Sequence, residues 1–237
     1  MHGELDIMTP GKPAREHELK FPLPAARVPL VEQWLRTFCR PHPGFADTLI
    51  SSIYYDTDDW RFLNEKVDSD YLKGKVRLRW YHSRRGSAPV HAYIEAKLKE
   101  GGQRFKHRYE TSLTAEEVDR LPLDSPRYRE VLRCLEEQGL RGVSRLSPAY
   151  QITYRRLRFG HSFTPSIFCL DHAIEVPRVN HGRFRQVRAG YYPSAVFEQK
   201  GPLEELDPVV RGVRHFRLEK RSFSKYMAAY FWLTEAV

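Results

Sequence analysis

The sequence is poor in cysteine and has no long apolar run, and each absence excludes a class of protein. Its three cysteines, Cys39, Cys134 and Cys169, lie far apart in 237 residues, which argues against a disulfide scaffold or a thiolate zinc site. The longest apolar stretch, around residues 226–233, is far too short to span a bilayer. The first six positions include acidic and polar residues and no apolar segment, so no signal peptide is expected. We expect a soluble, cytoplasmic protein.

Motifs of covalent catalysis are missing as well. The ten histidines show no metal-ligand spacing, and no Ser–His or Cys–His pairing is visible. What the sequence has instead is positive charge, with a formal net charge of +9. This charge favours an anionic partner, which could be nucleic acid, an acidic membrane surface or a polyphosphate-type ligand.

The remaining composition suits one globular domain, because 41% of the residues are hydrophobic. Residues 1–13 show little periodicity and are expected to form a loose tail, which leaves 14–237 as a single domain. Alternation and turn signals predict strands over residues 16–21, 49–55, 73–82, 90–99, 104–111, 149–159, 166–176 and 194–201. Helices are predicted over residues 28–38, 113–139 (with a capping box of Thr114 and Glu117, and a second helix starting near Ser125-Pro126) and 222–233. The basic stretch 177–193 is expected to be a loop or hairpin.

The most informative local pattern is E-x-E-x-K, formed by Glu16, Glu18 and Lys20. Alternate side chains of a strand project from the same face, so these two carboxylates and one ammonium line up in a row. Such a row could hold a divalent cation at one end and a phosphate at the other. A solvated strand with mixed charges explains the pattern equally simply when it is taken alone.

The same division into a charged and an apolar face recurs in later strands. Val76, Leu78 and Trp80, for example, alternate with Lys75, Arg77 and Arg79. The other charged or polar faces comprise Tyr93, Glu95, Lys97 and Lys99; Arg104, Lys106, Arg108 and Glu110; Tyr154, Arg156 and Arg158; and Glu198 and Lys200.

Two architectures fit this alternation. One is an open sheet or sandwich whose charged face meets water, and the other is a closed barrel whose charged face lines a tunnel. The charged faces carry mostly arginine and lysine with single, well-separated glutamates, whereas solvated faces usually mix lysine and glutamate with serine, threonine and glutamine. Convergent cations are costly unless an anion neutralises them, which favours the tunnel.

Phosphoryl transfer is the chemistry that requires such a set of cations. Its transition state spreads charge over phosphate oxygens, so catalysis consists mainly of positioning and electrostatic stabilisation. Arginine supplies paired donors and lysine supplies point charges. Glu16, Glu18 and Glu198 would hold Mg²⁺ or Mn²⁺, which prefer oxygen ligands.

The set of motifs resembles the triphosphate tunnel metalloenzymes, also called the CYTH-like superfamily. Within this group the chain looks most like the VTC-type polyphosphate polymerase domain. The segments that carry the resemblance are the E-x-E-x-K strand, Ser-Ile-Tyr-Tyr-Asp-Thr at 52–57, Val-Arg-Leu-Arg-Trp-Tyr at 76–81, Phe-Glu-Gln-Lys at 197–200 and Phe-Ser-Lys-Tyr at 223–226. They occur in the family's order over nearly the whole chain.

This resemblance implies an α+β fold, namely a closed antiparallel eight-stranded β-barrel with helices packed outside and a C-terminal helix. It also implies metal-dependent transfer of the γ-phosphate of a nucleoside triphosphate onto polyphosphate. The residues carried over as phosphate-binding are Lys20, Arg77, Arg79, Lys97, Tyr154, Arg156, Ser224 and Lys225. Alternation adds Lys106, Arg108 and Lys200. Glu198 would be the principal metal ligand, with Glu16 and Glu18 in support.

The sequence departs from the family pattern at two positions. The strand before Asp171 usually starts with an arginine but here reads Ser166-Ile167, and a basic residue expected three positions before Lys225 is Ser222. Both changes reduce the number of positively charged side chains that line the predicted tunnel.

Three functions therefore stay open at this point. The first is a polyphosphate polymerase acting on a nucleoside triphosphate, with ATP as the expected donor. The second is a triphosphatase in which water attacks, and the third is a non-catalytic binder of polyphosphate or nucleic acid. No sequence-specific nucleic acid and no membrane insertion are expected, and any coupling to a membrane would need a partner protein. Nucleotide preference, acceptor length and oligomeric state are not indicated.

Overall fold

The structure is a computed structural model that describes residues 17–68, 72–82, 90–100, 103–184 and 191–234. Glu16 and the predicted tail 1–13 lie outside the described residues, as do the basic positions 185–190. No helix in the described ranges is both long and apolar enough to cross a membrane.

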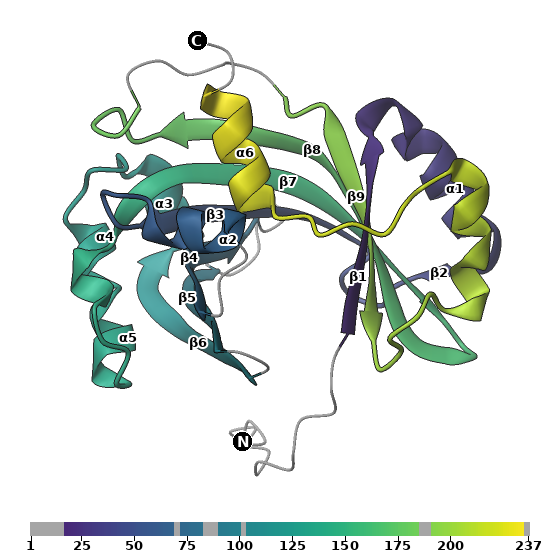
Figure 1. Cartoon of the computed structure of the whole chain (residues 1–237), viewed down its shortest axis with the longest axis horizontal. Helices are drawn as coiled ribbons and strands as arrows, with labels where there is room; N and C mark the ends of the chain where they lie inside the picture. The colour runs from purple at the N-terminus through teal and green to yellow at the C-terminus, as the bar shows by residue number, and fades with distance from the viewer. Residues whose placement is uncertain (1–16, 69–71, 83–89, 101–102, 185–190, 235–237) are drawn as a thin grey trace.

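One large antiparallel sheet forms the centre of the molecule (Figure 1). Its strands are β1 (His17–Pro24), β2 (Arg40–Pro41), β3 (Asp47–Asp56), β4 (Leu72–Tyr81), β5 (His91–Glu100), β6 (Gln103–Thr114), β7 (Ser147–His161), β8 (Thr164–Val179) and β9 (Ser194–Gly201). Eight of them follow the order β1-β9-β8-β7-β3-β4-β5-β6, and the short β2 pairs with β7. The eight strands predicted from alternation are thus confirmed, with shifted ends.

Six helices and three 3-10 segments surround the sheet in the described part of the chain. They are α1 (Val28–Phe38), α2 (Arg61–Val67), α3 (Ala115–Arg120), α4 (Arg127–Glu130), α5 (Arg133–Glu137), α6 (Lys225–Thr234), η1 (Ala25–Arg27), η2 (Val143–Arg145) and η3 (Pro208–Phe216). The capping box is confirmed, because Glu117 N–H donates to the Thr114 hydroxyl at 3.3 Å while Thr114 N–H donates to the Glu117 carboxylate at 2.8 Å.

Two sequence-based predictions about element bounds were wrong. The helix expected from residue 113 starts at Ala115, because β6 continues to Thr114. The second helix expected near Ser125-Pro126 is confirmed as α4, which starts at Arg127, and a further short helix, α5, follows it. The loop expected from residue 177 starts later, because β8 runs to Val179. Helix α2 and the segment η3 were not predicted, since both are short and depend on packing rather than on periodicity.

The apolar faces of the strands lie under helices, as the alternation predicted. At one end of the sheet, α1 and η3 cover Leu19, Phe21, Phe197 and neighbouring apolar residues. At the other end, α3, α4 and α5 cover a second cluster that includes Leu78. Burial of these faces turns the charged side chains of the same strands toward the opposite, concave side.

Helix α6 lies on the charged side of the sheet rather than outside it. Its buried residues Tyr226 and Trp232 pack with Tyr54 and Tyr154, whose side chains project from the same face as the predicted phosphate ligands. The C-terminal helix is therefore part of the wall around the charged residues.

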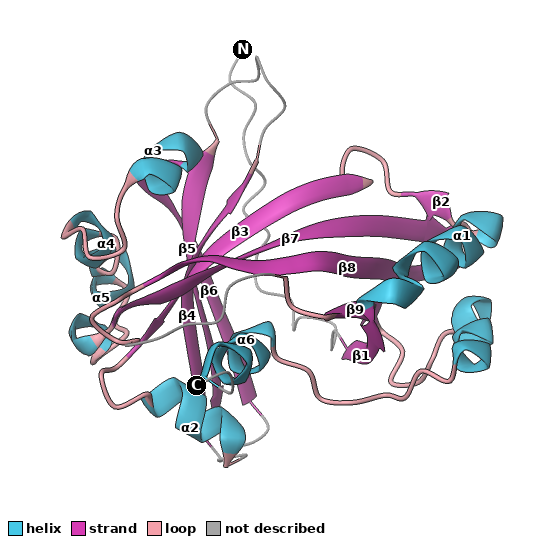
Figure 2. Cartoon of the chain, turned by 90° about the horizontal axis from the view of Figure 1, so that it is seen from above, coloured by secondary structure: helices cyan, strands magenta, loops and turns pink. Residues whose placement is uncertain are grey.

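The sheet is strongly curved, so that β4–β6 run across the direction of β7 and β8 (Figure 2). The charge of Lys97 on β5 acts on Glu18 on β1, although these strands are far apart in the pairing order. In the described residues, pairing runs from β1 to β6 with no pairing between these two end strands. The large antiparallel sheet of an α+β fold is thus confirmed, whereas closure into a barrel stays a prediction.

Candidate functional site

Four charged side chains form a buried cluster where β7, β8, β9 and the start of α6 meet. Arg156 donates two hydrogen bonds to Asp171, at 2.5 and 2.6 Å, and one to Glu198 at 2.9 Å. Lys225 contacts both Asp171 and Glu198, the latter at 3.3 Å. Although burial alone would raise it, Lys225 and Arg156 hold the pKa of Glu198 well below its usual range. Both carboxylates are therefore ionised, and each cation faces two of them.

The first turn of α6 places Lys225 in this cluster. Tyr226 donates its hydroxyl proton to Asp56, and the Tyr150 hydroxyl donates to the Tyr226 carbonyl at 2.5 Å. The Ser224 hydroxyl lies 3.4 Å from the N–H of Met227, which is the geometry of a helix N-cap. Ser224, predicted to bind substrate, thus also shapes the helix that carries Lys225.

Three further charges extend the cluster along β1 and β9. The register pairs Glu18 with Lys200 and Lys20 with Glu198, so all four side chains project from one face. Glu18 contacts Lys20 and Lys200, each at 3.3 Å, and Lys200 reaches Glu198 at 3.7 Å. Burial and Glu198 would each raise the pKa of Glu18, but the surrounding lysines lower it to about 2.

A second buried group lies on β3, β4 and β5. Arg77 donates to Glu95 at 2.7 Å, and Arg79 donates to the hydroxyl of Tyr154 at 3.3 Å. Glu95 is only 3% exposed, and despite its burial Arg77 and Arg79 lower its pKa to about 2. Tyr54 completes the group, because its hydroxyl accepts a hydrogen bond from Arg77 at 3.4 Å.

We expect Arg77→Ala to weaken tripolyphosphate binding by about 1.5–3 kcal/mol, the loss of a charge-assisted hydrogen bond. The same change leaves the buried Glu95 carboxylate without its closest cation, so it should also lower the melting temperature. Arg77→Ala/Glu95→Ala should recover much of the stability but not the affinity. Titration calorimetry and thermal unfolding of both variants separate the two effects, and unchanged affinity in Arg77→Ala would remove this residue from the site.

The remaining predicted cations lie nearer to solvent. Lys97 and Lys106 are exposed and oppose each other across β5 and β6. Arg108 lies 3.7 Å from Glu95 and 4.1 Å from the ring centre of Tyr93. The structure therefore places every predicted residue within its described ranges on the same charged side of the sheet, while Glu16 lies outside them.

Sequence reasoning did not assign Asp171, Glu95, Tyr54 or Lys75 to the site. The alternation that identified Arg77 also places Lys75 and Glu95 on its face, so this signal could have identified both. Asp171 entered the sequence analysis only as the end of a strand of the family pattern, and its pairing with Arg156 of β7 became visible only in the structure.

The carboxylates could hold a divalent cation only together with ligand oxygens. The described residues contain no group of three His, Cys, Asp or Glu side chains that could bind a metal by themselves. Glu198 and Glu18 nevertheless offer hard oxygen donors on paired strands. Small divalent ions are commonly held by one or two carboxylates plus substrate phosphates, and this donor set fits that arrangement.

At both positions where the sequence departs from the family pattern, a lysine from another element lies nearby. Ile167, where an arginine was expected, pairs in register with Lys200 on β9. Ser222, where another cation was expected, accepts a hydrogen bond at 3.0 Å from Lys66 of α2. The described charged side therefore retains cations near both positions, supplied by other elements.

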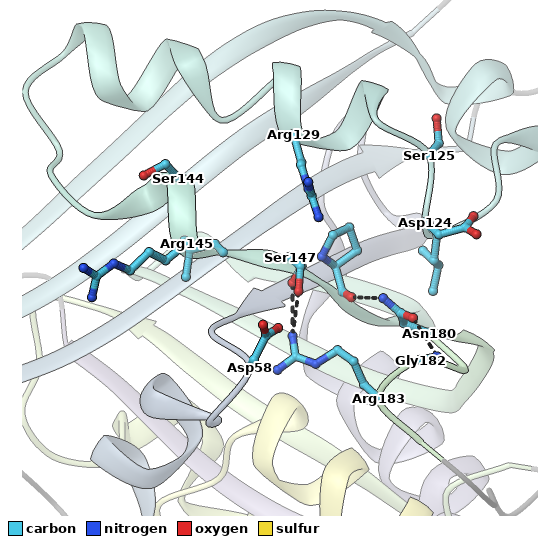
Figure 3. Close-up of a pocket in the computed structure, with 13 residues that line it drawn as sticks. Asp58, Asp124, Ser125, Arg129, Ser144, Arg145, Ser147, Asn180, Gly182 and Arg183 are labelled. Atoms are coloured by element: carbon cyan, nitrogen blue, oxygen red, sulfur yellow. Dashed lines mark hydrogen bonds between the residues drawn. The ribbon is translucent and has the colours of Figure 1, made fainter.

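A separate polar pocket of about 440 Å³ lies beneath α4 and η2 (Figure 3). None of the predicted site residues lines it. Arg129 and Arg183 point into it together with Asp58, so positive and negative charges are mixed there (Figure 3). The Arg183 guanidinium already donates to the Asp56 carbonyl at 3.0 Å and to the Ser147 hydroxyl at 3.2 Å. We assign the triphosphate site to the sheet and not to this pocket.

Comparison with one solved structure supports the fold. A protein from Bacillus halodurans described as a "putative adenylate cyclase" has a TM-score of 0.51 and 14% identity, over 87% of this chain and 92% of that chain. Proteins from Pyrococcus horikoshii and Pyrococcus furiosus give TM-scores of 0.47 and 0.43 at 14% and 12% identity, over 91% and 88% of this chain and 98% and 97% of theirs. At these identities the likeness concerns the fold alone.

Comparison with protein families is more specific. No curated protein matches the sequence. The family profile of the VTC domain, however, matches residues 15–234, which is nearly the whole chain. The matched range includes the buried charge cluster and both strands that carry Glu18 and Glu198. The chain therefore belongs to the VTC domain family, within the CYTH-like triphosphate tunnel fold.

Proposed function

We propose that this chain is a metal-dependent polyphosphate polymerase that transfers the γ-phosphate of a nucleoside triphosphate, with ATP as the expected donor, onto a polyphosphate chain. The observation that supports it best is the charge distribution on the concave side of the sheet. Carboxylates gather on β1, β8 and β9 around Glu198, whereas Lys75, Lys97 and Lys106 on β4–β6 have no carboxylate of the described residues within 4.0 Å. In this proposal the curved sheet encloses the substrate as a tunnel.

A triphosphate fits this distribution because its charge must be compensated along its whole length. Arg77 and Arg79 present guanidinium groups from neighbouring positions of β4, already fixed by Glu95 and Tyr154. Such fixed donors need no reorganisation as charge develops on the transferred phosphoryl group. Lys225 is held by Asp171, so it can stabilise a phosphate without losing its position.

The VTC family implies a divalent metal, and Glu198 and Glu18 would hold it. Such a metal, when bound, neutralises charge on the triphosphate and helps to align it. The protein side chains keep the carboxylates in place, because Arg156 holds Glu198 oriented and ionised, and Lys20 and Lys200 do the same for Glu18. No nucleophilic side chain is needed, because a phosphate oxygen of the growing chain attacks in line.

One incubation tests this function against its alternatives. The protein is mixed with ATP and Mn²⁺, or with ATP and Mg²⁺, and the products are separated by size. Long phosphate chains are the expected result. Free phosphate alone would show a triphosphatase instead, and tight polyphosphate binding without turnover would show a binding domain; either outcome overturns the polymerase proposal.

We expect tripolyphosphate binding to weaken as the pH rises above 7, because Lys75 loses its proton there. Burial lowers its pKa to about 7, with Arg77, Lys20 and Lys97 acting in the same direction and Tyr54 opposing them. A bound anion favours the ammonium form, so affinity should fall by up to about tenfold per pH unit between pH 7 and 9. Calorimetry in matched buffers measures the affinity for tripolyphosphate at each pH. Because the ligand itself also titrates, the same series is measured for Lys75→Met, and the difference between the two proteins reports on Lys75. Equal pH dependence of both proteins would contradict the assignment.

A further inference from the structure

The charged side of β4, β5 and β6 contains rows of lysines that face each other across the strands. Lys75 pairs in register with Lys97, and Lys97 with Lys106. Two residues further toward the β5–β6 turn, Lys73 pairs with Lys99. The adjacent row is different, because there Glu95 separates Arg77 from Arg108. The strands thus pass from a charge-compensated row to two rows of cationic residues, the outer of which continues from Lys73 and Lys99 to Arg104 of β6.

Lysines directly opposite each other on neighbouring strands repel and destabilise a sheet. No carboxylate of the described residues lies within 4.0 Å of the ammonium group of Lys73, Lys75, Lys97 or Lys99. Elsewhere on the same face, Glu95 and Glu198 each contact several cations. The lysine rows therefore form a region whose charge is compensated by something other than the described side chains.

Helix α2 adds a further lysine to this region. Lys66 lies against the segment that precedes α6, where its ammonium donates to the Ser222 hydroxyl at 3.0 Å. The neighbouring residue of α2, Glu65, accepts a hydrogen bond at 2.8 Å from the N–H of Gly74, the residue after Lys73, so the end of α2 that carries Lys66 lies beside the outer lysine row. Three consecutive elements, α2, β4 and β5, thus bring cations to the same end of the site.

We propose that Lys66, Lys73 and Lys99 form a track that binds the phosphate chain beyond the triphosphate site. This inference rests on the proposed function and extends it, because it assigns where a polymer longer than three phosphates runs. Successive rows are separated by two residues of strand, or about 7 Å. A continuous linear polyanion can compensate both rows at once, whereas a triphosphate held by Arg77, Arg79 and Lys225 that reaches the inner row at Lys75 leaves the outer row uncompensated.

The composition of the track favours inorganic polyphosphate over single-stranded nucleic acid. Proteins that bind nucleic acid strands without sequence preference interleave cations with aromatic side chains on which bases stack. Cationic residues occupy all three register positions of the outer row, Lys73, Lys99 and Arg104, and no aromatic residue is interleaved among them. The track therefore matches a ligand that carries charge but no bases.

The test compares two ligands in one pair of variants. Lys73→Met/Lys99→Met removes two charges while keeping the length of the side chains. We expect its affinity for long-chain polyphosphate to fall about tenfold or more, with the dependence of log Kd on log salt reduced by about 2, one for each lysine removed. Its affinity for tripolyphosphate should stay within about twofold of the parent, and Lys66→Met should show the same selectivity to a smaller extent.

Arg129→Met/Arg145→Met is the matched control, because it removes two exposed cations around the separate pocket of Figure 3. If this control weakens long-chain binding equally, only net charge matters and the track is refuted. Equal loss of affinity for both ligands would place Lys73 and Lys99 inside the triphosphate site instead. An oligoribonucleotide that binds as tightly as polyphosphate, and loses as much affinity, would overturn the choice of ligand.

Two further readouts keep the result interpretable. Removing the repelling lysines should leave the melting temperature unchanged or raise it, so loss of folding is not expected to obscure the comparison. Polymer synthesis is scored separately in the parent protein. If the parent protein binds long chains selectively but synthesises none, only the polymerase proposal is overturned. If the parent protein synthesises polymer and the double variant keeps full affinity for long chains, only the track is overturned.

Discussion

Glu198→Gln should reduce metal-dependent turnover by at least about a hundredfold while leaving the fold intact. Glu198 is 2% exposed and contacts three cations, Arg156, Lys200 and Lys225, whereas Asp171 contacts two of them. Glutamine keeps its shape but lacks the charge that would hold a divalent ion. Turnover with ATP is measured over a range of Mn²⁺ and Mg²⁺ concentrations, together with the melting temperature.

Anion binding without metal separates this role from a structural one. Removing a negative charge beside the phosphates should leave metal-free tripolyphosphate affinity unchanged or make it tighter. Glu32→Gln on the outer helix α1, where Glu32 pairs with Arg36, is the matched control and should behave as the parent protein. Full turnover in Glu198→Gln would refute the assignment of the metal to this residue.

Asp171→Ala should lower the free energy of unfolding by about 3–5 kcal/mol, the largest stability effect that we expect at the site. Asp171 is completely buried and accepts two hydrogen bonds from Arg156, and it also contacts Lys225. Without it, two buried cations share the single carboxylate of Glu198. Urea unfolding measures the loss, which should correspond to a melting temperature lower by roughly 10 °C.

The chain contains a nearly ideal control for this change. Arg155, the residue before Arg156, makes the same kind of two-fold contact with Asp47, but on the outer side of the sheet, where the two side chains are 55% and 40% exposed. Asp47→Ala should cost no more than about 1 kcal/mol, because solvent screens exposed ion pairs. Similar losses in both variants would show that the burial of Asp171 contributes nothing to its importance.

Much of the site could be predicted from the sequence because strand alternation is strictly local. Once Val76, Leu78 and Trp80 are assigned to a helix-covered face, Arg77 and Arg79 must project from the other one. The structure agrees, since all three apolar residues are buried in the cluster under α3–α5. The family resemblance rested on the same local motifs, and the match to the VTC profile confirmed it.

Other features could not be predicted because they depend on contacts between distant segments. Lys66 supplies a cation beside Ser222, where the family pattern has a basic residue, and these two residues are 156 positions apart in the sequence. The link between Asp56 and Tyr226, which anchors the helix carrying Lys225, spans 170 positions. No period or motif in a single sequence encodes such pairs, because each exists only after the sheet has curved and α2 and α6 have packed.

The sequence by itself determined which side chains share a face, the order of the strands along the chain, the excess of positive charge and the family. Only the tertiary structure decided which of those charges compensate each other. Arg156 and Arg77 are matched by carboxylates from neighbouring strands, whereas no carboxylate in the described part of the chain lies within 4.0 Å of the ammonium groups of Lys73, Lys75, Lys97 and Lys99. The physical reason is that the chain sets the alternation within a strand, while register and curvature set the partners across strands.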